Sequence, residues 1–342
     1  MKPNPRMVTL ARESRGLSQG DLAHAMGMTA PHLSRIEKGD VMLTGEYIDR
    51  LAEATRFPKQ FFYRTGDILP EHLAYRRRIH VSFKQLYAIQ AWVNIIRLHV
   101  EQLAPLVLHR YQLRLPQYKV TERNTPAKIA ERVRRDWELD KPVIPNMVRL
   151  LEDKGIVTIA VDFGTERVDS LHIITKDKIP VIIYNKLLLG DRQRFTLAYE
   201  LGQLIMHSID HLQPDTDISR EANEFAAAFL MPSEAIRGDL RGDVTVALLA
   251  ALKKKWKQSM ISILYRADDL GLINANQKRS LLQQFNHLHI RRHEPLELDV
   301  PAEESKLMKH WIAEYRSKTG LGTAGVAEAF ALRTDEFLEL YA

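Results

Sequence analysis

Two short helices joined by a tight turn are indicated between residues 17 and 39, and this pattern constrains the fold more than any other stretch. Ser18 is a favourable N-cap, and Asp21 stands three residues later, where a capping box places its acid. Gly27 can adopt the positive φ that ends a helix sharply, and Thr29 can cap the next helix. These signals predict a helix-turn-helix.

The outer face of the second helix is predicted to carry side chains suited to DNA. In helix-turn-helix modules, the N-terminal part of this helix meets base edges in the major groove. Arg35 can donate two hydrogen bonds to guanine, whereas His32 and Ser34 can make single polar contacts. Gln19, at the start of the preceding helix, is placed to contact a phosphate. The predicted interface with a double-stranded DNA operator comprises Gln19, Thr29, Ala30, Pro31, His32, Ser34, Arg35 and Lys38.

Charge permits DNA binding by this segment but does not demonstrate it. Residues 1–65 carry ten Lys and Arg against seven Asp and Glu, and the net charge of the whole chain is +6. Arg12 and Arg15 are expected to join Lys38 in contacts with the phosphate backbone. Such a module can instead dock proteins, but we favour DNA because the second helix exposes the residue types that base readout uses.

Residues 17–39 resemble the Xre/Cro-type repressor family, which implies a compact five-helix DNA-binding domain over residues 1–66. Beyond it, apolar spacing from Ser82 to Leu108 predicts a long helix, and Thr125 starts another. The long helix is expected either to pack on the next domain or to join two subunits, which suits a reader of two-fold symmetric operators. Residues 67–140 are therefore predicted to be a helical linker and a candidate dimerisation region.

Short strands mix with helices between Val143 and Ile273. Strands are predicted at Ile156–Val161, Leu171–Ile174 and Val181–Tyr184, because β-branched and aromatic residues cluster there. The next periodic stretch, Arg192–His207, is predicted to be a helix. A small sheet combined with helices is therefore expected in this part of the chain.

The predicted helix Arg192–His207 carries an incomplete zinc motif. In H-E-x-x-H, two histidines at i and i+4 bind zinc, and the glutamate after the first activates a metal-bound water. Glu200 keeps the glutamate position, whereas Tyr199 and Gln203 occupy the histidine positions. Further on comes a second stretch, E-A-N-E-F-A-A-A-F-L-M-P, that begins at Glu221. This order is similar to the ImmA/IrrE-type zinc metallopeptidase family, and the resemblance implies that Glu221 corresponds to the third zinc ligand.

The changes in this motif predict a domain without catalysis or cofactor. Tyr199 would have to lose a phenolic proton with an ordinary pKa near 10, and Gln203 offers only a weak amide oxygen. Without a metal, Glu200 has no acidified water to deprotonate, so a structural hydrogen bond is its expected role. One alternative is a displaced metal site, which requires the helix to continue past its polar exit. Its ligands would be Glu221, His207 and His211.

Composition restricts the remaining possibilities. The chain of 342 residues has no cysteine, which excludes thiol catalysis, disulfides and cysteine zinc sites. No apolar run reaches the roughly 20 residues that cross a bilayer, and Met1–Pro5 lacks the apolar core of a signal peptide. We therefore expect a cytoplasmic protein that does not contact a membrane. Lys253–Lys255 is expected to form a solvated helix face.

The last part of the chain is predicted to be helical and charged. Two short capped helices are indicated near Gly325–Phe330 and Thr334–Leu338. They weakly resemble a second helix-turn-helix, but we favour a helical cap on the domain. The expected fold is α+β and mostly helical. Its four predicted parts are a helix-turn-helix domain (1–66), a helical linker (67–140), a metallopeptidase-like domain with a small sheet (141–275) and a helical C-terminal region (276–342).

These patterns predict a homodimeric DNA-binding transcriptional regulator with a catalytically inactive metallopeptidase-like domain. That domain would serve as a sensor for a peptide or small molecule, or as a dimerisation scaffold. Two alternatives are a zinc endopeptidase that cleaves a regulatory protein, and an antitoxin-like protein that binds a toxin-like partner and represses its own promoter.

Overall fold

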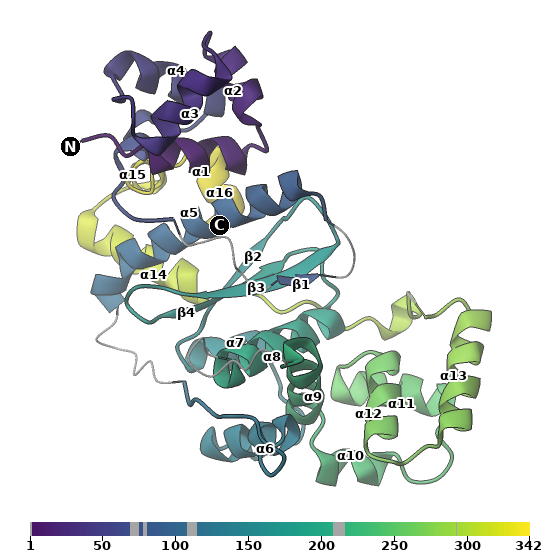
Figure 1. The fold of residues 1–342 in the computed structure, drawn as a ribbon. Helices are drawn as coiled ribbons and strands as arrows, with labels where there is room; N and C mark the ends of the chain where they lie inside the picture. The colour runs from purple at the N-terminus through teal and green to yellow at the C-terminus, as the bar shows by residue number, and fades with distance from the viewer. Residues whose placement is uncertain (1, 69–74, 78–80, 108–114, 208–215, 292) are drawn as a thin grey trace. The chain divides into compact units, whose positions relative to one another are not determined.

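The structure is a computed structural model that describes residues 2–68, 75–77, 81–107, 115–207, 216–291 and 293–342. The described chain is mostly helical with a four-stranded sheet, which confirms the predicted α+β class (Figure 1). Contacts divide the chain into two compact units. Unit 1 comprises Met1–Gln112, Val157–Asn185 and Lys306–Ala342, and unit 2 comprises Leu113–Ile156 and Lys186–Ser305.

Unit 1 begins with the predicted helix-turn-helix inside a small helical module, called the first module below. Ser18 Oγ accepts from the Asp21 amide at 3.0 Å, and the Asp21 carboxylate accepts from the Ser18 amide at 2.8 Å, so the capping box is confirmed. Gly27 has the positive φ, 64°, expected of the turn. The predicted fifth helix is only a single 3-10 turn, η1. The elements are α1 (Arg6–Ser14), α2 (Gln19–Ala25), α3 (Ala30–Lys38), α4 (Gly45–Thr55) and η1 (Lys59–Tyr63).

The long helix α5 (Phe83–Val107) matches the predicted one and packs on α1 and on α14 (Leu307–Thr319). Residues 93–100 are all buried within the chain, so this described stretch leaves no free face for a second subunit. The helix packs on elements of unit 1, and its expected role in joining two subunits stays a prediction. Phe83, at the start of α5, is 77% exposed, and the buried part of the helix begins at Ile89.

The sheet of unit 1 has the strand order β1-β3-β4-β2. Strand β2 runs parallel to β4, whereas β3 is antiparallel to both β4 and β1. The three predicted strands are confirmed, and β1 is an addition within the predicted helical linker. Three residues are too few to show a strand pattern. The strands are β1 (Tyr75–Arg77), β2 (Val157–Val161), β3 (Val168–Ile174) and β4 (Pro180–Asn185).

Contacts group this sheet differently from the predicted domain boundaries, which put residues 157–185 inside 141–275. The grouping follows from pairing, since β1 precedes α5 in the chain and joins β3. In addition, α14 packs on β2. The sheet is therefore tied to both ends of the chain, and the four predicted boundaries stay a prediction.

His99 on α5 ties the C-terminal helices α15 (Thr323–Ala329) and α16 (Thr334–Tyr341) to the middle of unit 1. Its ring is fully buried, with Nε2 2.9 Å from the Phe330 carbonyl oxygen and Nδ1 2.7 Å from the Tyr341 hydroxyl. Because the carbonyl can only accept, Nε2 donates, and in the neutral ring Nδ1 then accepts from the Tyr341 hydroxyl. Burial and the charge of Arg64 lower the pKa of His99 well below its ordinary value, although the bond to Phe330 opposes this.

We predict that the free energy of unfolding falls as the pH drops below about 6.5, the ordinary pKa of an unfolded histidine. Below that pH the unfolded chain binds a proton at His99. The folded chain binds it only when the pH falls below the lower pKa that His99 has in the folded state. One such proton contributes a slope of about 1.4 kcal/mol per pH unit. Urea unfolding at several pH values checks this: His99→Gln should lose that slope. The exposed control His287→Gln should keep it, and equal slopes in both variants would contradict the prediction.

Unit 2 is helical and centres on the packed pair α8 and α9. These two helices correspond to the predicted motif helix and to the stretch that begins at Glu221. They approach closely, because a Cβ added to Gly202 would lie 2.8 Å from the Phe225 ring. The helices are α6 (Pro126–Asp136), α7 (Met147–Asp153), α8 (Gly190–Met206), α9 (Ile218–Leu230), α10 (Ser233–Asp239), α11 (Val246–Trp256), α12 (Met260–Asp269), α13 (Ala275–His287) and η4 (Leu296–Leu298).

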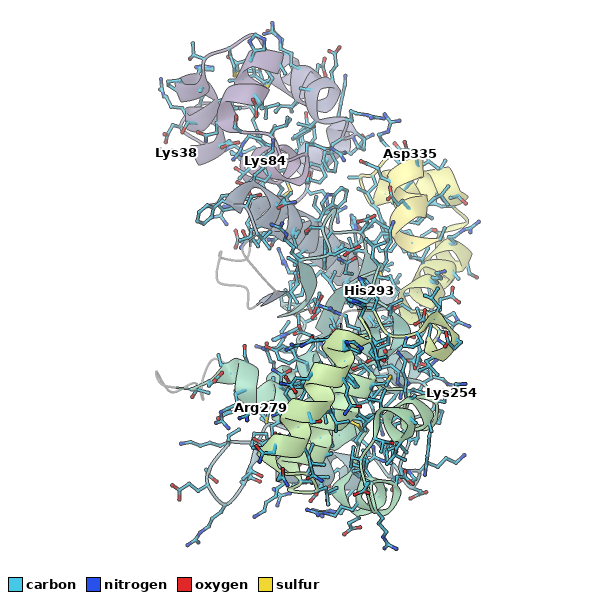
Figure 2. The ribbon with its side chains drawn as sticks, turned by 90° about the vertical axis from the view of Figure 1, so that its right-hand side faces the viewer. Lys38, Lys84, Lys254, Arg279, His293 and Asp335 are labelled. Carbon is cyan, nitrogen blue, oxygen red and sulfur yellow. The ribbon has the colours of Figure 1, made fainter. Side chains whose placement is uncertain are left out.

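Lys253 corrects the expectation of a solvated lysine face on α11. Its side chain is 1% exposed, and its ammonium lies 2.7 Å from both the Asp191 and the Glu294 carboxylates. Burial alone would lower the pKa of Lys253, but the hydrogen bonds and charges of the two carboxylates outweigh burial and raise it. Lys254, labelled in Figure 2, is exposed as expected.

Glu303 joins α7 and α8 through one carboxylate. It accepts from the Val148 amide at 2.9 Å at the start of α7 and pairs with the buried guanidinium of Arg194 on α8. Arg194 also donates to the Ile144 carbonyl oxygen at 2.7 Å. A buried cation that loses its carboxylate is costly, because no water replaces the lost partner.

We predict that Glu303→Ala destabilises the chain by about 3–5 kcal/mol, because it leaves Arg194 buried without its carboxylate. Denaturant unfolding measures the loss. The exposed Glu297→Ala is the control and should change stability by no more than about 0.5 kcal/mol. Similar losses in both variants would show that the ion pair is not what stabilises this region.

Candidate functional site

Helix α3 presents the predicted base-reading face. Pro31, Arg35 and Lys38 are exposed, whereas Leu33 and Ile36 are buried. Within the described part of the chain, Arg35 and Lys38 form no ion pair or side-chain hydrogen bond; Lys38 is labelled in Figure 2. Two cations are therefore available on the outer face of a helix in the position that major-groove readers use.

The other predicted residues of the interface surround this face. Thr29 is exposed at the N-cap of α3, followed by the partly exposed Ala30. Ser34 is half-buried. His32 is also half-buried, and its Nε2 lies 3.0 Å from the hydroxyl of Tyr47 on α4. His32 is thus held by a neighbour, which fixes its ring relative to α4.

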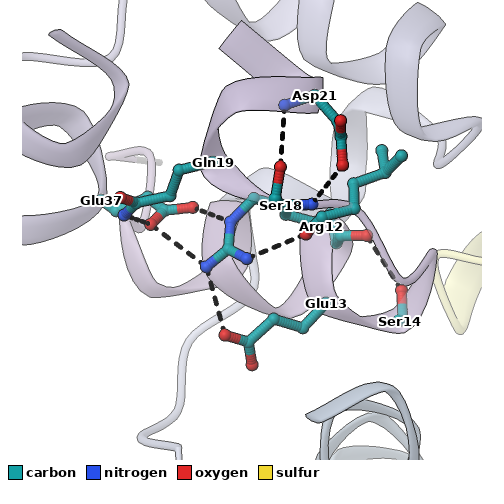
Figure 3. A network of polar contacts seen from close by, with 9 residues as sticks. Arg12, Glu13, Ser14, Ser18, Gln19, Asp21 and Glu37 are labelled. Carbon is teal, nitrogen blue, oxygen red and sulfur yellow. Dashed lines mark hydrogen bonds and ion pairs between the residues drawn. The ribbon is translucent and has the colours of Figure 1, made fainter. Parts of the chain in front are cut away.

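Gln19 and Arg12 belong to a polar network that links α1, α2 and α3 (Figure 3). Gln19 Nε2 donates to the Glu37 carboxylate at 2.7 Å, and Arg12 Nε donates to the same group at 2.6 Å. Burial alone would lower the pKa of Arg12, but Glu37 and Glu13 outweigh it and raise that pKa. Arg12 is only 9% exposed, so the expected phosphate contact of Arg12 was wrong. The phosphate contact of Gln19 stays a prediction.

Arg15 also serves the fold instead of the phosphate backbone. Its guanidinium lies 4.3 Å from the centre of the Phe57 ring and pairs with the Glu336 carboxylate on α16. Its Nε donates to the Thr55 carbonyl oxygen at 2.7 Å. No local sequence signal indicates these contacts, because the partners stand 40 or more residues away along the chain.

The altered zinc motif forms a second site, on the facing sides of α8 and α9. Gln203 Nε2 donates to the Tyr199 hydroxyl oxygen at 2.9 Å, and that oxygen lies 3.3 Å from Ser219 Oγ on α9. One turn further on, His207 Nε2 lies 2.8 Å from the Glu221 carboxylate. The fold therefore brings the predicted motif residues together in a polar row.

Most residues of this row are withdrawn from solvent, whereas Ser219 is exposed and His207 is half-buried. Tyr199, Gln203 and Glu221 are 3%, 5% and 8% exposed, and Glu200 is fully buried. Among the described residues, no group of three or more His, Asp or Glu side chains is arranged to hold a metal ion. Helix α8 ends at Met206, with His207 as its C-cap, and His211 lies outside the described residues.

Two family models match the chain. Residues 9–62 match the helix-turn-helix family, and residues 151–268 match the family described as the IrrE N-terminal-like domain. The search of curated proteins gave no match. The chain therefore joins a helix-turn-helix module to an ImmA/IrrE-type domain, and the helix-turn-helix match supports a DNA-binding regulator. None of the described helices is long and apolar enough to cross a membrane.

Proposed function

We propose that this chain is a DNA-binding transcriptional regulator, most simply a homodimer on a two-fold symmetric operator. The exposed cations Arg35 and Lys38 of α3, in a helix-turn-helix module, carry the proposal. Base readout would come from Arg35, with single contacts from Ser34 and His32, while Lys38 and Gln19 would meet phosphates. Thr29, Ala30 and Pro31 would lie at the groove edge.

We further propose that the ImmA/IrrE-type domain binds no zinc and catalyses no peptide hydrolysis. The donor set does not fit the metal, because zinc prefers thiolate, imidazole and carboxylate ligands, whereas a phenol and an amide stand at two ligand positions. Tyr199 and Gln203 already satisfy each other through their hydrogen bond. Among the described residues, Glu221 and His207 leave too few donors for a tetrahedral site. The domain would then act as a sensor for a peptide or small molecule, or as a scaffold for assembly.

We predict that Arg35→Ala weakens binding of a DNA duplex selected by the wild-type chain by about 1–3 kcal/mol and relaxes the preference at one base pair. Lys38→Ala should instead weaken all duplexes alike and reduce the salt slope by about one. Fluorescence anisotropy at several salt concentrations separates the two effects. The exposed Lys254→Ala in unit 2 is the charge-matched control and should bind as wild type does.

We predict that protein purified without a metal-binding tag contains no stoichiometric zinc by elemental analysis. The double substitution Tyr199→His and Gln203→His should gain one zinc per chain, because two imidazoles would then lie one helical turn apart beside Glu221. The single change Gln203→His is the control and should bind more weakly. One zinc per wild-type chain would overturn the proposed loss of the metal site and favour a zinc endopeptidase.

A further inference from the structure

The C-terminal helices repeat the helix-turn-helix of the first module at a constant spacing along the chain. Helix α2 starts at Gln19 and α15 at Thr323, while α3 starts at Ala30 and α16 at Thr334. Both starts are therefore 304 residues apart (323 minus 19 and 334 minus 30). The sequence pattern alone favoured a simple helical cap here, and the structure gives a reason to prefer a second helix-turn-helix.

The turns of the two copies have the same backbone conformation. Gly27 has a φ of 64°, and its counterpart Ala331 has a φ of 54°, which is uncommon for a residue with a side chain. After each turn, an amide reaches back over five residues: Met28 to Ala23 and Leu332 to Ala327, both at 2.9 Å. A left-handed residue followed by such a hydrogen bond also ends other helices of this chain, as at Gly271 and Leu272, so the constant 304-residue spacing is what relates the two copies.

The buried positions of the two copies also correspond. Each pair below has the same 304-residue offset, and both members are at most 4% exposed. The pairs are Leu22 and Val326, Ala23 and Ala327, Met26 and Phe330, and Leu33 and Phe337. The glycines that end the preceding helix match too, because Gly16 has a φ of 61° and Gly320 a φ of 70°. The helix before that glycine is α1 in the first copy and α14 in the second.

The outer faces of the two second helices carry opposite charge. The position of Arg35 on α3 is occupied by Glu339 on α16, and the position of Pro31 by Asp335. His32 corresponds to Glu336. Carboxylates at these positions repel phosphate, so α16 is unsuited to DNA.

The second copy instead contacts the first module and α5. Glu336 on α16 pairs with Arg15, the C-cap residue of α1, and Glu328 on α15 accepts from Gln60 Nε2 at 3.1 Å. Arg64 donates to the Phe330 carbonyl oxygen at 2.7 Å, next to the buried bond between His99 and that carbonyl. Figure 1 shows α15 and α16 beside α1 and α5. Around these bonds remains a pocket of about 640 Å³, so the contact is not a sealed apolar interface.

We propose that α14–α16 form a second helix-turn-helix module that does not read DNA, and that its docking on the first module steadies α1 and thereby the reading helix α3. The partner of this surface is the first module of the same chain. The statement that the second module does not read DNA rests on the proposed function. The statement that the second module docks on the first module is independent of the proposed function.

Two adjacent carboxylates of α16 provide a matched test in the full chain. Glu336→Gln removes the partner of Arg15. Asp335→Asn removes the same charge from the same helix, but its carboxylate contacts only neighbouring groups among the described residues, the Arg333 guanidinium and the Glu336 amide. Asp335 is labelled in Figure 2. Hydrogen exchange of the α1, α3 and α16 amides is measured in each variant, with and without a DNA duplex selected by the wild-type chain.

We expect Glu336→Gln to accelerate exchange in α1 and α16 by about twofold to fivefold, the range that partly exposed ion pairs produce, while Asp335→Asn leaves it unchanged. Affinity for the selected duplex should fall within the same range only in Glu336→Gln. Equal exchange in both variants would overturn the docking. Glu328→Ala, which removes the acceptor of the exposed contact with Gln60, is a second variant that should act in the same direction without threatening the fold.

The same measurement tests whether α16 reads DNA. Added duplex should slow exchange in α3 and leave α16 unchanged. Slowing of both helices to a similar extent would overturn the claim that the second module does not read DNA. Absence of slowing in α3 would instead be a failure of the proposed function, and the comparison of Glu336→Gln with Asp335→Asn would still decide the docking.

Discussion

The two hydrogen bonds of the buried His99 ring are the contact on which unit 1 depends most. They join the middle of α5 to a carbonyl at the end of α15 and to the hydroxyl of Tyr341 near the end of α16. Arg15 pairs with Glu336 on α16 and lies over the ring of Phe57, so it also connects α16 to the first module. A single neutral imidazole thus anchors a layer of helices to which the first module is also attached.

Local signals predicted the elements well, because capping and periodicity act within a few residues. Ser18, Asp21 and Gly27 defined the helix-turn-helix, and the three longer strands followed from their β-branched residues. Contacts between distant residues were missed. Arg12 and Lys253 were expected to face solvent, yet each is buried against carboxylates that stand far along the chain. Strand β1 was missed because its three residues gain a strand conformation only by pairing with β3.

The motif on α8 could be located from sequence because a helix places residues four apart on one face. The hydrogen-bond partners of the motif residues could not be located from the sequence. The mutual bond of Tyr199 and Gln203 and the pairing of His207 with Glu221 depend on how α8 packs against α9. The close approach at Gly202 and Phe225 sets that packing. A single glycine in a helix does not predict that another helix packs against it.

The path of the chain through its two units has a consequence for biosynthesis. Unit 1 takes residues from the beginning, the middle and the end of the sequence, and unit 2 is formed by the segments between them. On a ribosome, His99 therefore emerges long before Phe330 and Tyr341. Until both have emerged, α5 cannot form its contacts with α15 and α16. A polypeptide released early would carry α3 with its cations but an uncovered apolar α5, so nascent chains of this protein should need protection from aggregation until residue 341 has left the exit tunnel.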